Sequence, residues 1–590
     1  MNSLFGTWTS RLRKNSLLLV LSILLPIFGI SNTVMAAEKI YVSYSILEIP
    51  IPVISLEKFT KTGNIDQELA GYQDYIAPQQ LQKLREILLR SIKISPAVAT
   101  QFLYTEQGEF LLHRLAKLIK NKSAYTETAV NDLRNAIIFA SKEPGGLTFL
   151  NILSHYPSIS IHVDLANSLE IAGELENLIT ETNQAIATIQ ELSKIESATG
   201  SKTNLSQLLS LQKPKKVTSK NIRLDFFDAT RNRSLLTDVY LPNVQHPTPV
   251  IVISHGLGLN SSNFHYLAKH LASQGLAVVL PNHPQLFTSH NHNSKFKEAK
   301  EFINRPLDIK YILDQLENYN QSNPQFQDKL NLQQVGVMGQ SFGGYTALAL
   351  AGAKINFQQL DQDCHPDRLQ NTWNMSLLLQ CRALELLPKS QREDNSNLSI
   401  DLQDERVKAA IAINPITSSI FGKSGLNQIQ TPVMFISSSE DTVAPALYEQ
   451  IIPFSWLNNP DKYLVMLIGG THFSTIGNSQ PGSKQISLPA DMVGNASQAR
   501  TYINALSLPF FQTYVSRKPE YIPYLNAGYA ANIADKSLGL SFIQSLKNPQ
   551  LVPTLDNNIQ KQLPFTIIEF GYWILAIAVS LLHIIIFVMF

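Results

Sequence analysis

A serine framed by glycines is the first feature of the sequence that could carry chemistry. Gly339-Gln340-Ser341-Phe342-Gly343 has the G-x-S-x-G spacing, between a run that predicts a strand and a run that predicts a helix. The tight turn requires small residues at Gly339 and Gly343, because strand and helix approach closely there, and it presents the serine hydroxyl as a nucleophile. A glycine-rich structural turn is the alternative interpretation.

A serine nucleophile needs a base, and the base needs a group that orients it. The expected chain order is serine, acid, histidine. The predicted strand 433–436 leads into Asp441, and the predicted strand 464–468 is followed by two glycines and His472. We therefore expect Asp441 as the acid and His472 as the base. Glu440 is the rival acid, because spacing alone cannot separate adjacent residues on a loop.

Two backbone N–H groups must hold the oxyanion that forms during attack on a carbonyl. One is expected from Phe342, directly after the serine, and the other from Leu257, in the glycine-rich loop after the predicted strand 250–253. His255 in the same loop could instead be a base, but it precedes the nucleophile in the chain. We assign it a structural role.

Alternating strand and helix patterns must position these residues. From residue 221, continuous apolar runs of strand length alternate with helical patterns, which predicts a mostly parallel, doubly wound sheet covered on both faces. We expect an α/β catalytic domain at 221–520. Residues 354–402 interrupt the alternation and are expected to form a helical cap insertion, and residues 521–564 a C-terminal extension.

The N-terminal third of the chain has a different pattern of apolar residues. Residues 38–195 predict a mainly helical domain, with apolar residues at intervals of three and four and a strand pair within 40–54. No catalytic constellation stands out there, so we expect a packing or substrate-gating module. Residues 196–220 are polar and rich in Ser and Lys, which is typical of a linker.

Both ends of the chain are apolar. Residues 1–36 read as a signal peptide with a basic start, an apolar run and a cleavage site near Ala36; an uncleaved anchor is the alternative. Residues 568–590 predict a transmembrane helix, because Phe570 to Phe590 contains no formal charge; a docked terminal helix is the alternative. Together they predict an exported protein that its C-terminus anchors to the membrane.

Composition excludes several classes of protein. The chain has 590 residues, 44% of them hydrophobic and 16% charged, with a net charge of +2. This excludes general disorder and gives no electrostatic footprint for nucleic acid. Cys364 and Cys381 would form a disulfide after export or remain two free buried thiols. His290-Asn291-His292 is interpreted as a polar loop, and we expect no metal and no other cofactor.

The catalytic motifs resemble those of the α/β-hydrolase superfamily. SHGLG at 254–258, GQSFGG at 339–344, SEDTVAP at 439–445 and GGTHF at 469–473 are most similar to platelet-activating-factor acetylhydrolases and cutinase-like esterases. With NMSLLLQCRALEL at 374–386, the N-terminal helical unit resembles exported cyanobacterial α/β-hydrolases that carry an N-terminal domain of unknown function, DUF1400.

The resemblance implies a serine carboxylic-ester hydrolase. Ser341, Asp441 and His472 would be its triad, Leu257 and Phe342 its oxyanion donors, and a lipid ester its substrate. A polyester or small-ester esterase and a serine peptidase are the enzymatic alternatives. A membrane-anchored scaffold on a hydrolase fold is the non-enzymatic one.

Overall fold

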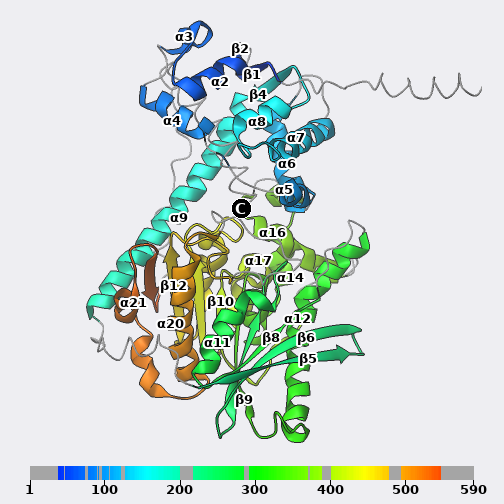
Figure 1. The fold of residues 1–590 in the computed structure, drawn as a ribbon, viewed down its shortest axis with the longest axis vertical. Coiled ribbons are helices and arrows are strands. Elements are labelled where there is room, and N and C mark those ends of the chain that lie inside the picture. Colours follow the sequence, from blue (N-terminus) through cyan, green and yellow to red (C-terminus); the bar gives the residue numbers. More distant parts are fainter. Residues whose placement is uncertain are drawn as a thin grey trace, which may run out of the picture. The chain divides into compact units, whose positions relative to one another are not determined.

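The computed structural model describes residues 37–44, 47–73, 78–89, 91, 96–104, 106–120, 126–199, 217–284, 292–369, 372–387, 400–477 and 493–546. The predicted signal peptide at 1–36 and the predicted transmembrane segment at 568–590 lie outside these residues. Within the described ranges, no helix is long and apolar enough to cross a membrane. The chain forms two compact units, mostly before and mostly after the junction of Ser168 and Leu169 (Figure 1).

The first unit contains a small four-stranded sheet as well as helices. Its strands are ordered β2-β1-β4-β3, and β1 pairs antiparallel with β2 and parallel with β4. The strands are β1 (Lys39–Tyr44), β2 (Leu47–Pro52), β3 (Ile119–Lys120) and β4 (Ser160–Asp164). The helices of this part of the chain are α2 (Val53–Thr62), α3 (Gln67–Gln73), α4 (Pro78–Leu89), α5 (Pro96–Leu103), α6 (Glu106–Leu118), α7 (Thr126–Ala140) and α8 (Phe149–His155).

The sequence pattern missed β3 and β4. The first spans two residues and the second five, which is too short for a period of two to stand out among helical patterns. The first unit therefore remains mainly helical, with a sheet of four strands where the sequence predicted a strand pair.

The predicted boundary between the domains is displaced. Helix α9 (Leu165–Thr199) continues past the expected domain end at 195 and into the predicted linker. From Leu169 onward it belongs to the second unit, where Ala185, Ile186 and Ile189 are buried in the core. These three residues were expected in the N-terminal domain, so the second unit begins earlier than the sequence predicted. Residues 200–216 of the predicted linker lie outside the described ranges.

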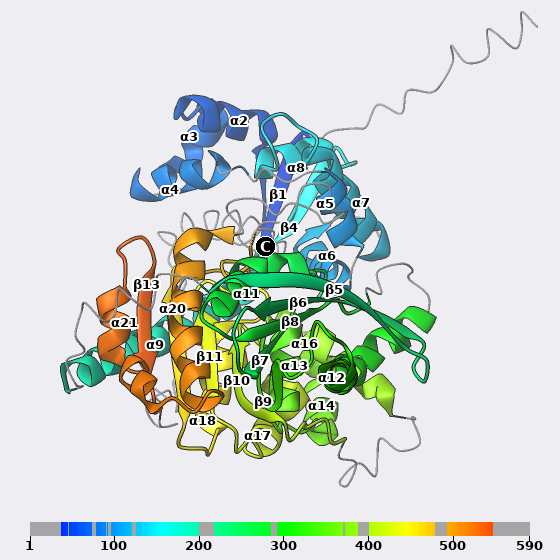
Figure 2. The ribbon, with the colours of Figure 1, turned by 60° about the horizontal axis from the view of Figure 1, so that its bottom comes forward.

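A nine-stranded sheet forms the second unit, in the order β13-β12-β11-β10-β9-β7-β8-β6-β5 (Figure 2). Its strands are β5 (Ser219–Asp228), β6 (Arg233–Pro242), β7 (Thr248–Ser254), β8 (Ala277–Pro281), β9 (Leu330–Gln340), β10 (Val407–Ile413), β11 (Val433–Ser438), β12 (Lys462–Ile468) and β13 (Gly539–Ile543). The pairs from β8 to β12 are parallel, and the pairs at both edges are antiparallel.

The strand order reverses at β7, since β8 lies on one side of it and β9 on the other. In open α/β sheets, ligands bind outside the carboxyl ends of the strands at such a reversal. The fold therefore points to the ends of β7 and β9, where the sequence has Ser254 and Ser341.

Helices cover both faces of the sheet, which explains the continuous apolar runs. Val250 and Val252 of β7 are buried in one core, whereas Ile251 and Ile253 are buried in the other. The first core contains side chains of α12 (His292–Ser322), α13 (Phe342–Leu350), α17 (Ser418–Leu426) and α18 (Ile452–Trp456). The second contains those of α11 (His265–Ser273) and α20 (Ala496–Tyr514). A strand buried on both faces has no polar side to alternate with.

The described part of the predicted C-terminal extension belongs to the second unit. Strand β13 closes one edge of the sheet by pairing antiparallel with β12. It follows the 3-10 helix η7 (Pro519–Tyr524) and α21 (Ala527–Ile533). Five residues with a serine in the middle gave too weak a strand signal to reveal this.

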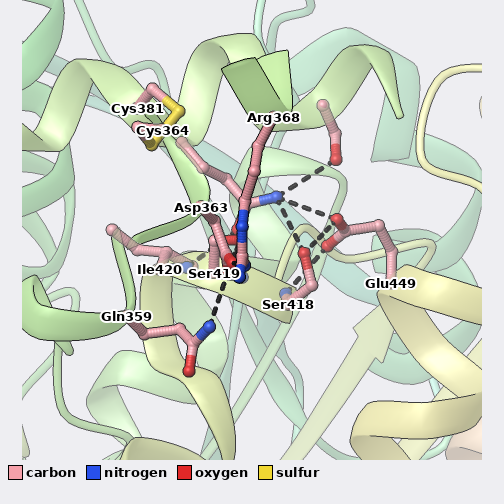
Figure 3. Close-up of a disulfide and its surroundings, with 11 residues drawn as sticks. Gln359, Asp363, Cys364, Arg368, Cys381, Ser418, Ser419, Ile420 and Glu449 are labelled. Carbon is pink, nitrogen blue, oxygen red and sulfur yellow. Dashed lines mark hydrogen bonds and ion pairs between the residues drawn. A yellow bond between two sulfur atoms is a disulfide. The ribbon is translucent and has the colours of Figure 1, made fainter. Parts of the chain in front are cut away.

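The predicted cap insertion consists of short helices: α14 (Phe357–Asp363), α15 (Pro366–Leu369), α16 (Met375–Gln380) and the 3-10 helix η3 (Cys381–Leu386). A disulfide joins Cys364, just after α14, to Cys381 at the start of η3 (Figure 3). Phe357 and Ala383 are buried in the first of the two cores, so this segment packs against the body of the second unit.

Candidate active site

Ser341 stands at a strained turn between β9 and α13. Its φ is 56°, a left-handed value that residues other than glycine rarely adopt. Its N–H donates to the carbonyl of Ile413, at the end of β10, over 2.8 Å. Such strain persists only where the surroundings impose it, and it clusters at functional sites.

The two glycines of the motif allow the close approach that this turn needs. A Cβ on Gly339 would lie 2.1 Å from the carbonyl oxygen of Gly343. A Cβ on Gly343 would lie 2.1 Å from the carbonyl oxygen of Ser254, the last residue of β7. The second contact brings the start of α13 against the loop that follows β7.

Asp441 and His472 meet at the carboxyl ends of β11 and β12. Nδ1 of His472 lies 2.7 Å from Oδ2 of Asp441 in a hydrogen bond, and both side chains are buried. The other oxygen of Asp441 accepts from the amides of Val443 and Ala444 at 2.9 and 2.7 Å. The rival acid, Glu440, is exposed, so Asp441 is the carboxylate that orients the histidine.

Two side chains that the sequence interpretation passed over hold the histidine loop. The amides of Gln340, next to the serine, and of Asn414 donate to the carbonyl of His472 over 3.0 and 3.2 Å. No signal in the sequence marks Gln340, because it occupies a position of the G-x-S-x-G motif at which any residue is allowed. Asn414 carries a signal that could have found it, since it is a polar residue directly after the buried strand β10.

The loop after β7 lies against the same residues. A Cβ on Gly256 would lie 2.4 Å from Oε1 of Gln340, so this loop, the serine turn and the histidine loop all contact one glutamine side chain. The two expected amide donors differ in exposure: the side chain of Phe342 is buried and Leu257 is 39% exposed.

The hydrogen bonds of the described residues join His472 to Asp441 but not to Ser341. Hydrogen bonds between a nucleophile and its base are often long without substrate and shorten when substrate binds. Ser341, Asp441 and His472 thus lie on loops that follow strands of one sheet. Of the two hydrogen bonds expected in a triad, the one between His472 and Asp441 is present.

His255 is locked in one neutral form. Its Nε2 accepts from the amide of His283 over 3.1 Å, and its Nδ1 lies 2.8 Å from the carbonyl oxygen of Gly256. Since an amide only donates and a carbonyl only accepts, the proton is on Nδ1. Burial, with Arg305 and His283 nearby, lowers the pKa of His255 well below its usual range. A histidine with both nitrogens engaged in this way is not free to act as a base.

Comparison with known families agrees with this geometry. A family described as "alpha/beta hydrolase fold" matches residues 249–393, which include the serine turn and the loop after β7. A second, described as "Alpha/beta hydrolase of unknown function (DUF1400)", matches residues 36–164. Both matched families are α/β hydrolases, and the second unit has the α/β-hydrolase fold. No curated protein matches this hydrolase.

The hydrolase also has a cavity of about 700 Å³ away from these residues. It is lined by the start of α17, the cap helices, α18 and the second-unit part of α9, but not by Ser341, Asp441 or His472. Figure 3 labels several of the lining residues, among them Ser418, which donates to the carboxylate of Glu449. This cavity is separate from the candidate active site.

The His290-Asn291-His292 segment, which the sequence predicts as a polar loop, is described only at His292. His290 and Asn291 lie outside the described residues. Within the described ranges, no group of three or more His, Cys, Asp or Glu side chains is placed to hold a metal ion.

Proposed function

We propose that this hydrolase is a serine carboxylic-ester hydrolase in which Ser341, His472 and Asp441 are the triad. The observation that carries the proposal is the hydrogen bond between His472 and Asp441, beside a serine held at a φ of 56°. Together they supply an oriented base and a nucleophile that protrudes from the end of a strand.

The reaction proceeds in two steps. Oγ of Ser341 attacks the ester carbonyl while Nε2 of His472 takes its proton, and the carbonyl electron pair becomes an oxyanion held by the amides of Leu257 and Phe342. When the C–O bond to the alcohol breaks, His472 returns the proton to the leaving oxygen. Water then repeats the sequence on the acyl-enzyme and releases the acid.

We propose a lipid ester as substrate. The support is the resemblance of the four catalytic motifs to lipid-ester hydrolases, together with the apolar segment 568–590 expected at a membrane. The test is a panel of esters that vary in acyl length and head group, with polyester films and peptides included. Preference for short acyl groups on phospholipid supports the proposal, and cleavage of peptides alone contradicts it.

We further propose that the hydrolase works outside the cytoplasm, as its leader predicts. The disulfide between Cys364 and Cys381 supports this, because disulfides persist in oxidising compartments. Sequencing the N-terminus of the protein purified from its cells should show a start near Ala37. An intact N-terminus with both thiols free contradicts the proposal.

Replacing the nucleophile tests the function directly. Ser341→Ala should abolish ester hydrolysis and labelling by a fluorophosphonate, because no other group can form the acyl-enzyme. Circular dichroism and the thermal midpoint should remain close to those of the wild type, since the substitution removes one half-buried oxygen. If ester hydrolysis survives the substitution, the assignment of Ser341 as nucleophile is wrong. It is also wrong if the fluorophosphonate fails to label the wild type.

A further inference from the structure

One buried arginine contacts both segments that are proposed to hold the oxyanion. Nη1 of Arg305, on α12, donates to the carbonyl of His255 over 2.8 Å, just before Gly256 and Leu257. The guanidinium carbon of Arg305 also lies 4.7 Å from the centre of the Phe342 ring. The Arg305 side chain is 2% exposed. From helix α12, Arg305 thus contacts residues that follow the ends of β7 and β9.

The contact with the carbonyl of His255 bears on the direction of the Leu257 amide. The Nδ1–H of His255 and the amide of Leu259 both reach the carbonyl oxygen of Gly256, at 2.8 and 3.3 Å. Since the peptide unit is planar and trans, fixing that oxygen fixes the opposite direction of the Leu257 N–H. Arg305 holds the carbonyl one residue earlier, so it limits rotation of the same stretch of backbone.

A buried ion network fixes Arg305 in turn. Its Nε lies 3.8 Å from the carboxylate of Glu301, one helical turn away. Arg233 donates to both oxygens of Glu301, at 2.7 and 3.1 Å, and to both oxygens of Asp308, at 2.8 and 2.7 Å. Asp308 also bonds His283, whose amide contacts His255. The network therefore begins and ends at the loop after β7.

Stability alone does not account for this network. Replacing a buried ion network by apolar side chains is often neutral or stabilising, because desolvation offsets the attraction between the charges. Burial lowers the pKa of Arg305 to about 10 despite the opposing effect of Glu301 and Asp308. The guanidinium thus stays charged at neutral pH, where it acts as a donor and as a planar group against Phe342.

We propose that Arg305 is a positioning residue for the oxyanion site. It holds the carbonyl of His255 and the ring of Phe342 so that the amides of Leu257 and Phe342 converge on the oxyanion. The inference rests on the proposed function, because it concerns the same reaction. Substrate binding before the chemical step does not require this convergence, whereas the tetrahedral intermediate does.

The test compares variants per active site. Arg305→Met and Arg305→Lys are titrated with a fluorophosphonate, and kcat and KM for p-nitrophenyl acetate are measured per titrated site. We expect kcat to fall about 10- to 100-fold with KM within about 2-fold, since removing one oxyanion donor outright costs about 10²–10³ in kcat. Arg305→Lys should recover little, because an ammonium lacks the planar face.

An inhibitor supplies a readout that a structural role would not move. An alkyl trifluoromethyl ketone adds to the serine and leaves an oxyanion in the site, so its Ki should rise by the same factor as kcat falls. Both quantities are measured on the correctly formed sites alone, so a variant that folds poorly still reports on positioning.

Arg406 offers the matched control. It bonds Asp404 and Asp314 and donates to the carbonyl of Lys310 on the same helix α12. It precedes β10 (Val407–Ile413), at the end of that strand opposite the site. Arg406→Met should lower the thermal midpoint but leave the rate per site and the ketone Ki unchanged.

Two results separate the failure of this inference from that of the proposed function. If both Arg305 variants keep kcat and ketone affinity within about 2-fold of the wild type while Ser341→Ala is inactive, Arg305 has no positioning role and the esterase proposal stands. If Ser341→Ala retains activity, both proposals are overturned.

Discussion

The two carboxylate oxygens of Asp441 have different hydrogen-bond partners. One accepts the amides of Val443 and Ala444, which fixes the carboxylate in place, and the other bonds Nδ1 of His472. The acid therefore does not rotate freely, and it fixes the Nδ1 side of the His472 ring, which leaves Nε2 for the proposed role as base. At the residue scale, this pair decides between adjacent acids that the sequence left open.

Asp441→Asn tests that division. An asparagine can still accept the two amides, but its NH₂ would face Nδ1 and force the histidine into the wrong tautomer. We expect kcat for p-nitrophenyl acetate to fall by about 10⁴, as a triad acid replaced by its amide does elsewhere, with the thermal midpoint nearly unchanged. Glu440→Gln is the control and should keep kcat within about 2-fold. A large loss in the control and none in Asp441→Asn would reverse the assignment.

At the scale of elements, every residue of the proposed triad follows the carboxyl end of a parallel strand. Ser341 follows β9, Asp441 follows β11 and His472 follows β12. Parallel strands present these ends at one edge of the sheet, so separate parts of the chain meet there. The apolar runs predicted these strands well, because each is buried on both faces.

A disulfide joins two of the cap helices. The bond between Cys364 and Cys381 closes a loop with a sequence separation of 17, which by chain entropy contributes about 3 kcal/mol to the free energy of unfolding. We expect Cys364→Ala/Cys381→Ala to lose about that much in urea unfolding.

Because the proposed catalytic residues lie on other loops, the double variant should keep its rate per titrated site. Reduction of the wild type with dithiothreitol should lower its stability similarly. An unchanged unfolding midpoint in both experiments would contradict the stabilising role, and a lost rate per site would place the cap in the chemistry.

On the scale of the whole molecule, stability should depend on pH through buried histidines. Burial lowers the pKa of His270, on α11, to about 4. A histidine in the unfolded chain has a pKa of about 6.5, so the unfolded state binds the proton first as the pH falls. The stabilising contribution is complete above pH ~6.5 and is lost between there and pH ~4.

Urea unfolding at several pH values checks this expectation. His270→Leu should reduce the loss of unfolding free energy below pH ~6.5 by up to about 1.4 kcal/mol per pH unit. His246→Leu, at an exposed position, should follow the wild-type curve. Parallel curves for His270→Leu and the wild type would show that this histidine does not set the acid limit.

The sequence by itself determined the local backbone features on which the proposed chemistry depends. Short-range patterns predicted the glycine-framed turn at Ser341, the strands that precede Asp441 and His472, and the α/β class, because turn geometry and burial on two faces depend on neighbouring residues. The tertiary structure decided what depends on distant residues: Asp441 over Glu440, the support from Gln340 and Asn414, and the contacts of Arg305. It also assigned most of α9 and β13 to the second unit, since short or amphipathic segments gain their stability only from the surface on which they pack.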